Sequence, residues 1–165
     1  MMIKSVLCGL SLVAVAGAPA NPSPAGLKAL VGAYDVSNAA GDPAGALVLR
    51  ESPTTQGGYQ LVLSLGHPQP TYRTVYELKA TAHPEQFRVI RNDSDQLLEE
   101  EATALVAGES LIIRSWLVTR TGERVEVRDI LGSSNASDLV VRTMAWPPST
   151  AAPTTLRVLK ATRVQ

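Results

Sequence analysis

Short runs of apolar or alternating residues recur along almost the whole chain, and each is followed by a stretch of turn-forming residues. The connecting stretches, such as "NAAGDPAG", "SPTTQGG" and "GSSNASD", are rich in the residues that build tight turns. This spacing predicts short antiparallel strands joined in chain order as a meander. The ten predicted strands span 30–37, 46–51, 59–65, 71–80, 86–91, 97–106, 111–118, 124–130, 139–146 and 154–164.

Alternation within the runs agrees with strands. In "RVEVRDI", Val125 and Val127 alternate with Arg124, Glu126 and Arg128, as a strand with one buried face requires. The stretch 95–107 is different, because "DQLLEEEATALV" has the composition of a helix that Asp95 could cap. We favour a strand there, since "AGES" followed by "LIIRSW" resembles a hairpin return, but both alternatives stay open.

A meander of this many strands has two edges, and unpaired edge strands invite aggregation. Closing the first strand onto the last removes both edges most completely. We therefore predict an all-β fold, an antiparallel up-and-down β-barrel of eight to ten strands that forms a single domain over residues 30–165.

The first twenty residues have the features of a secretory signal peptide. Lys4 supplies a positive charge, an apolar run follows, and "APA" at 18–20 offers small residues for cleavage. The apolar run is too short to span a bilayer, so we expect no transmembrane segment in the mature chain. Residues 21–29 read as a leader with a short helical turn. The expected location is periplasmic or secreted.

Charge and cysteine content narrow the classes of partner. The chain has 15 Lys and Arg against 15 Asp and Glu, and its only cysteine, Cys8, lies within the predicted signal peptide. A nucleic-acid partner would favour a basic face, so we expect none. The predicted mature domain has no disulfide, so it must be stabilised by its core.

The start of the first predicted strand resembles a known group of barrels. In "LKALVGAYDV", a short helical stretch precedes Gly32 and Tyr34, similar to the Gly-x-Trp that begins the lipocalin and fatty-acid-binding barrels of the calycin group. The resemblance implies a lipocalin-like barrel in which an arginine of the last strand packs across the aromatic ring. Arg157 and Arg163 are the candidates for this barrel closure.

The sequence also departs from relatives within that group. Fatty-acid-binding proteins place two helices where this chain has only "NAAGDPAG", and their final Arg-x-Tyr is here Arg163-Val164-Gln165. Avidin-like barrels use several tryptophans to bind biotin, whereas this chain has two, Trp116 and Trp146. A biotin site is therefore not expected.

Residues that would indicate catalysis or metal binding form no complete motif. His67 and His83 precede prolines in separate predicted loops without further zinc ligands. "DSDQL" begins like a calcium loop, but Leu97 stands where an oxygen ligand belongs. No Gly-x-Ser-x-Gly nucleophile elbow is present. We expect no metal, no cofactor and no enzymatic activity.

Three predicted strands carry aromatic, cationic or thioether side chains on one side. If those sides face the lumen, they form a cavity for an amphipathic ligand with an acidic head. If they face outward, each arginine stacks on a neighbouring aromatic at the surface. Alternation does not decide between the two, although Leu111, Ile113 and Leu117 make the opposite side of one strand more apolar. The candidate ligand-binding residues are Tyr72, Tyr76, Arg114, Trp116, Arg142, Met144 and Trp146.

Two functions remain as hypotheses. The first is an exported barrel that binds a small hydrophobic or amphipathic molecule. The alternative is an envelope protein-interaction or enzyme-inhibitor barrel that has no ligand cavity. The volume of the lumen separates them, because a ligand binder needs a few hundred Å³ and a filled barrel leaves none.

Overall fold

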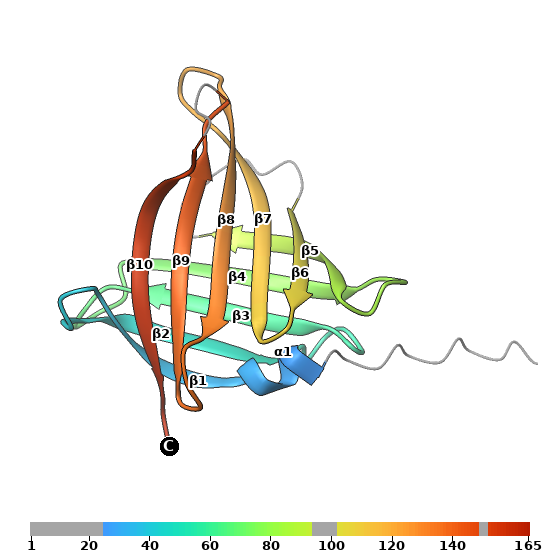
Figure 1. Cartoon of the computed structure of the whole chain (residues 1–165), viewed down its shortest axis with the longest axis vertical. Coiled ribbons are helices and arrows are strands. Elements are labelled where there is room, and N and C mark those ends of the chain that lie inside the picture. Colours follow the sequence, from blue (N-terminus) through green and yellow to red (C-terminus); the bar gives the residue numbers. More distant parts are fainter. Residues whose placement is uncertain (1–24, 94–101, 149–151) are drawn as a thin grey trace, which may run out of the picture.

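The computed structural model describes residues 25–93, 102–148 and 152–165. Within these ranges the chain forms one short helix and a closed barrel of ten antiparallel strands (Figure 1). The elements are α1 (Ala25–Leu30), β1 (Gly32–Ser37), β2 (Pro43–Glu51), β3 (Tyr59–Leu65), β4 (Tyr72–Ala80), β5 (Gln86–Asp93), β6 (Ala102–Ala107), β7 (Ser110–Val118), β8 (Arg124–Ser133), β9 (Asp138–Trp146) and β10 (Thr154–Arg163).

The barrel closes between the first and the last strand. Each strand pairs with its neighbours in the chain, and β1 also pairs antiparallel with β10, with Tyr34 opposite Arg163. The predicted all-β up-and-down barrel is therefore confirmed, at the upper end of the expected number of strands. Every strand therefore has two neighbouring strands within the described ranges, as closure of a barrel requires.

The strands form two layers that face each other across the core. Figure 1 shows β6–β10 running steeply across β1–β5. Alternate residues of each strand point between the layers, as Thr74, Tyr76 and Leu78 do on β4. On β7 the inward residues are Leu111, Ile113 and Ser115. Apolar side chains from all ten strands thus fill most of the interior.

The helix α1 covers one end of the barrel. Leu27 and Leu30 are buried in the core, and α1 contacts β6 and β7. A Cβ atom at Gly26 would lie 1.8 Å from the carbonyl oxygen of Gly108, in the β6–β7 turn, so only glycine permits this approach. We call this end the closed end, and the opposite end, which carries the β1–β2, β3–β4 and β7–β8 loops, the open end.

The uncertain stretch 95–107 is resolved only in part. Residues 102–107 form β6, so they are a strand, and the remaining residues 95–101 lie outside the described ranges. Of the predicted leader and helical turn at 21–29, residues 25–29 lie within α1, while residues 21–24 and the predicted signal peptide 1–20 lie outside the described residues. Among the described helical residues, none belongs to a helix long and apolar enough to cross a membrane.

Candidate functional site

The closed end contains a cluster formed by Gly32, Tyr34 and Arg163. The guanidinium of Arg163 lies 5.2 Å from the centroid of the Tyr34 ring, and its Nη2 donates a hydrogen bond of 2.8 Å to the Tyr34 hydroxyl. Arg163 Nη2 also donates to the carbonyl of Ala29, and the Tyr34 hydroxyl donates to that of Leu30. These bonds tie β10 and β1 to α1, so this cluster has a structural role.

Glycine at position 32 leaves room for this stack. A Cβ atom there would lie 3.3 Å from the guanidinium carbon of Arg163 and 3.3 Å from the Tyr34 ring. Burial raises the pKa of Tyr34, and the neighbouring charge of Arg163 acts in the opposite direction. The arginine packs across the aromatic ring in the way that the calycin resemblance implies.

Arg157, the second candidate for closure, does not contact Tyr34. It lies opposite Thr143 on β9, inside the barrel and toward the open end. Arg157 and Arg163 point to the same side of β10, but six residues of a strand span about 20 Å, so only Arg163 reaches α1. The assignment of Arg157 to barrel closure is therefore wrong.

Arg157 instead belongs to a buried polar cluster. Asp129 on β8 accepts hydrogen bonds from the hydroxyls of Tyr76, at 2.7 Å, and Thr143, at 2.6 Å. Arg157 Nη2 donates to the Thr143 hydroxyl at 3.0 Å and lies 3.9 Å from Asp129 Oδ1. Tyr76, Asp129 and Thr143 are only 4%, 7% and 8% exposed.

The electrostatics of the cluster keep Tyr76 protonated. Burial, reinforced by the nearby Asp129 carboxylate, raises the pKa of Tyr76 well above its ordinary value, and Arg91 opposes the shift. A neutral Tyr76 remains a hydrogen-bond donor, which Asp129 requires. Both carboxylate oxygens of Asp129 therefore accept a hydrogen bond within the cluster.

A second arginine approaches from β5. Arg91 Nη2 donates to the Tyr72 hydroxyl at 3.0 Å, and the Arg91 guanidinium lies 5.5 Å from the centroid of the Tyr76 ring. Two guanidinium groups from different layers, Arg91 and Arg157, thus reach the same part of the lumen.

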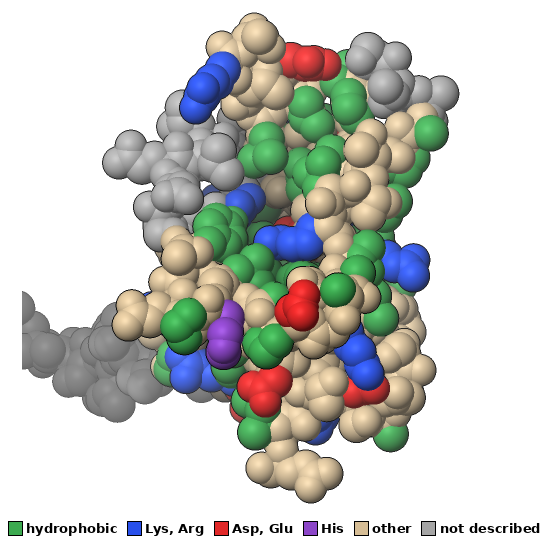
Figure 2. All heavy atoms as spheres, turned by 90° about the vertical axis from the view of Figure 1, so that its left-hand side faces the viewer, with side chains coloured by type: hydrophobic (Ala, Val, Ile, Leu, Met, Phe, Trp, Pro, Cys, Tyr) green, Lys and Arg blue, Asp and Glu red, His purple; other side chains and the backbone are tan. Residues whose placement is uncertain are grey.

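These residues surround a cavity of about 290 Å³ toward the open end. On the face shown in Figure 2, Lys or Arg side chains lie beside hydrophobic ones within a hollow. The cavity has apolar walls as well as the polar cluster. Its lining residues are Tyr72, Tyr76, Arg91, Leu117, Val127, Asp129, Thr143, Leu156 and Arg157.

The predicted candidates divide between the two sides of the barrel wall. Tyr72 and Tyr76 line the cavity, so their side of β4 faces inward. Arg114 and Trp116 on β7, and Arg142, Met144 and Trp146 on β9, alternate with the buried residues of their strands and face outward. These five residues do not line the lumen, because the more apolar sides of β7 and β9 fill the core.

At the surface the arginines stack on the tryptophans. Arg114 and Arg124 lie 5.2 and 4.5 Å from the ring centroid of Trp116, and Arg128 lies 4.3 Å from that of Trp146. This is the second of the two arrangements that the sequence left open.

Glu126 forms ion pairs with two of these arginines. Its carboxylate accepts 2.6 Å hydrogen bonds from Arg114 and Arg128. Although burial favours the protonated acid, the bonds from both arginines outweigh it and lower the pKa of Glu126. The outer wall therefore carries an ordered network of charges on top of its apolar contacts.

Sequence reasoning missed Arg91, Asp129 and Thr143. A signal for two of them was present: Arg91 continues the apolar side formed by Phe87 and Val89, and Asp129 continues the side formed by Val127. A charged residue at an apolar position of a period-two pattern points into the core. Such a residue is expected to be paired there, as both are.

Within the parts of the chain that the structure describes, no group of three or more His, Cys, Asp or Glu side chains could hold a metal ion. In comparison with known proteins, no family model matches this chain, and no curated protein matches it significantly.

Proposed function

We propose that this protein binds a small amphipathic molecule with an acidic head in the cavity toward the open end of the barrel. The observation that carries the proposal is the meeting of Arg91 and Arg157 in a partly apolar cavity of about 290 Å³. Small-molecule sites are concave, mostly apolar and contain a few placed polar groups. The volume lies just below the usual range of about 300–1,000 Å³ for such sites, so the ligand is small.

The acidic head would enter first. The polar cluster of Tyr76, Asp129 and Thr143 is almost fully buried, whereas Leu156 on the same wall is 57% exposed. Polar partners therefore lie deep, and apolar contact is available toward the solvent. A ligand in this orientation places its head near Arg157 and its tail along Leu117, Val127 and Leu156.

Arg157 provides a specific contact for the head. Its Nε is buried and has no hydrogen-bond partner among the described residues. A buried donor without a partner is costly, and a carboxylate oxygen would satisfy it while pairing with the guanidinium charge. Asp129 offers no competing base, because both its oxygens accept hydroxyl hydrogen bonds. We therefore propose binding and no catalysis.

Calorimetric titration with octanoate and octanol tests the proposal. Octanoate should bind at least tenfold more tightly than octanol, and Arg157→Ala should remove most of this preference. Arg142→Ala is the matched control, since Arg142 faces outward. Equal affinities for octanoate and octanol would contradict the proposed preference for an acidic head. The absence of a binding heat with both ligands would contradict the proposed site.

We also propose a location and a family. The protein is an exported, lipocalin-like barrel of the periplasm or the extracellular medium. The charged and apolar pattern of residues 1–20 supports export. The stack of Arg163 on Tyr34 beside α1 supports the calycin resemblance. Sequencing of protein recovered from the periplasm or medium should find Asn21 at the N-terminus. An intact Met1 on that protein would contradict cleavage.

A further inference from the structure

We propose that the outer wall of β4–β8 binds an extended acidic segment of a partner polypeptide. The carboxylates of the segment would lie on a row of basic side chains, and its apolar side chains would lie on a neighbouring apolar row. This site lies outside the barrel and is independent of the cavity proposed above.

The basic row crosses five strands. Lys79 on β4 pairs with Arg88 on β5, Arg88 pairs with Thr103 on β6, and Thr103 pairs with Arg114 on β7. Arg114 in turn pairs with Arg128 on β8. Paired residues share a face of the sheet, and adjacent strands lie about 4.8 Å apart. Four basic side chains therefore lie across roughly 19 Å of wall.

An apolar row runs beside the basic one. Leu105 on β6 pairs with Ile112 on β7, and Ile112 pairs with Ile130 on β8. These residues stand two positions from the basic row along their strands, which is about 6.8 Å. Leu105 is 41% exposed, so the row offers apolar surface to a partner.

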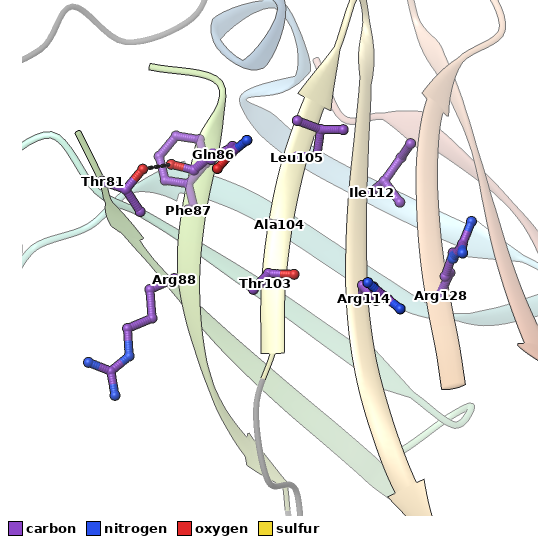
Figure 3. A pocket seen from close by; sticks show the side chains of 10 residues that line it. All are labelled: Thr81, Gln86, Phe87, Arg88, Thr103, Ala104, Leu105, Ile112, Arg114 and Arg128. Carbon is purple, nitrogen blue, oxygen red and sulfur yellow. Dashed lines mark hydrogen bonds between the residues drawn. The ribbon is translucent and has the colours of Figure 1, made fainter. Parts of the chain in front are cut away.

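The two rows border a groove of about 450 Å³. Figure 3 shows Arg88, Arg114 and Arg128 on three strands, with Leu105 and Ile112 further along β6 and β7. Among the described residues, those that line the groove include these five and no acidic one. Arg114 keeps 49% of its side chain exposed although it pairs with Glu126, so it can bind a second carboxylate.

A polypeptide fits these rows better than other anions do. In an extended chain, successive side chains point to opposite sides, so alternating acidic and apolar residues would meet the two rows at once. Bases or sugars would stack on tryptophan faces, but guanidinium groups lie over the rings of Trp116 and Trp146. A flat lipid surface does not enter a groove.

A titration with a labelled eight-residue peptide of alternating Glu and Val tests this site. Fluorescence anisotropy should show binding that weakens as salt rises from 50 to 300 mM, because charge pairs supply part of the affinity. Arg88→Glu should weaken binding at least tenfold. Arg50→Glu, which makes the same charge change on β2, should leave it within about twofold.

Two comparison probes separate the possible partners. A peptide of alternating Glu and Ser should bind at least fivefold more weakly, and equal binding would overturn the role of the apolar row. Vesicles rich in anionic lipid, or heparin, should bind less tightly than the Glu-Val peptide; tighter binding by either would overturn the choice of a polypeptide. No peptide binding at all would overturn the site.

Intrinsic fluorescence provides an independent readout. The two tryptophans, Trp116 and Trp146, both belong to the outer wall beside the basic row. The acidic peptide should change their emission, whereas octanoate in the lumen should not. A change with octanoate that Arg157→Ala leaves intact would show that the acid binds outside the barrel, which contradicts the cavity proposal alone.

Discussion

Arg163 and Arg157 lie on the same side of the same strand, yet they have different surroundings. At the closed end, Arg163 stacks on Tyr34 and donates to a carbonyl of the residues that form α1, so its hydrogen bonds are made within the protein. Toward the open end, Arg157 bonds to Thr143 and lines a cavity, with its Nε unpartnered among the described residues. Nε of Arg163 is likewise buried without a hydrogen-bond partner among the described residues, so the two arginines differ in what holds the rest of the guanidinium group. Arg163 is held by the Tyr34 ring and hydroxyl and by the Ala29 carbonyl, whereas Arg157 donates to the Thr143 hydroxyl beside a cavity.

The largest expected effect is at the closed end. Tyr34→Ala removes a fully buried ring and the partner of Arg163, so it should lower the free energy of unfolding by about 3–5 kcal/mol. Urea unfolding followed by circular dichroism measures this. A loss below 1 kcal/mol would show that the closed end is not a stabilising cap.

Removing the carboxylate of the buried cluster should have a smaller effect. Asp129→Ala leaves the hydroxyls of Tyr76 and Thr143 without their acceptor, and each unsatisfied buried donor costs about 1–3 kcal/mol. The substitution also removes a buried carboxylate, which offsets part of this cost, so we expect a net loss of about 1–3 kcal/mol. The same urea experiment applies, with Asp42→Ala in the exposed β1–β2 loop as the control. An unchanged midpoint for Asp129→Ala would mean that the cluster does not contribute to stability.

Alkaline pH should probe the same cluster. The pKa of Tyr76 in the folded state is raised above its ordinary value of 10.0, so the unfolded state loses the proton first. The stability from neutral Tyr76 is therefore complete below pH 10.0 and declines as the pH rises toward the folded-state pKa. Unfolding midpoints in urea at rising pH should fall less steeply for Tyr76→Phe than for the parent protein.

Low pH should reduce the stability that Glu126 contributes on the outer wall, whereas high pH affects Tyr76. The pKa of Glu126 is lowered from 4.5 in the folded state, so its contribution is present above that value and is lost as the pH falls through the folded-state pKa. Glu126→Gln should reduce the acid dependence of the unfolding midpoint. An identical pH profile would indicate that Arg114 and Arg128 do not stabilise the charged form.

Arg157→Ala should have the smallest effect on stability. The side chain is partly exposed and makes a single hydrogen bond among the described residues, so we expect a loss of less than about 1 kcal/mol. Affinity for octanoate should fall about tenfold all the same. A loss of stability as large as that of Tyr34→Ala would make Arg157 a structural residue like Arg163.

The fold was predictable because local signals in the sequence agree with one another. Turn residues mark almost every connection, and alternation identifies the strands between them. Stretch 95–107 was the exception, since its helix-forming composition competes with the pairing that makes residues 102–107 a strand. Tertiary pairing overrides local propensity there.

The candidate site was only partly predictable, because function depends on which side of each strand faces inward. The more apolar side formed by Leu111 and Ile113 favoured an outward Arg114 and Trp116 without deciding it, and their inclusion among the candidate ligand-binding residues was wrong, since they face outward. No local pattern distinguishes Arg157 from Arg163, since both occupy inward positions of β10. Their difference arises from α1 and β9, which are distant in the chain.

Because β1 also pairs with β10, the ten strands form a continuous ring in which any strand could come first in the chain. The N-H of Val164 donates to the carbonyl of Ala33 at 2.9 Å, and the beginning of α1 and the end of β10 lie toward the same end of the barrel. A linker between them would therefore add one more connection of the kind that joins the other neighbours. Circular permutation, with new ends in the exposed turn 119–123, should preserve the barrel, since exposed loop tips tolerate such breaks.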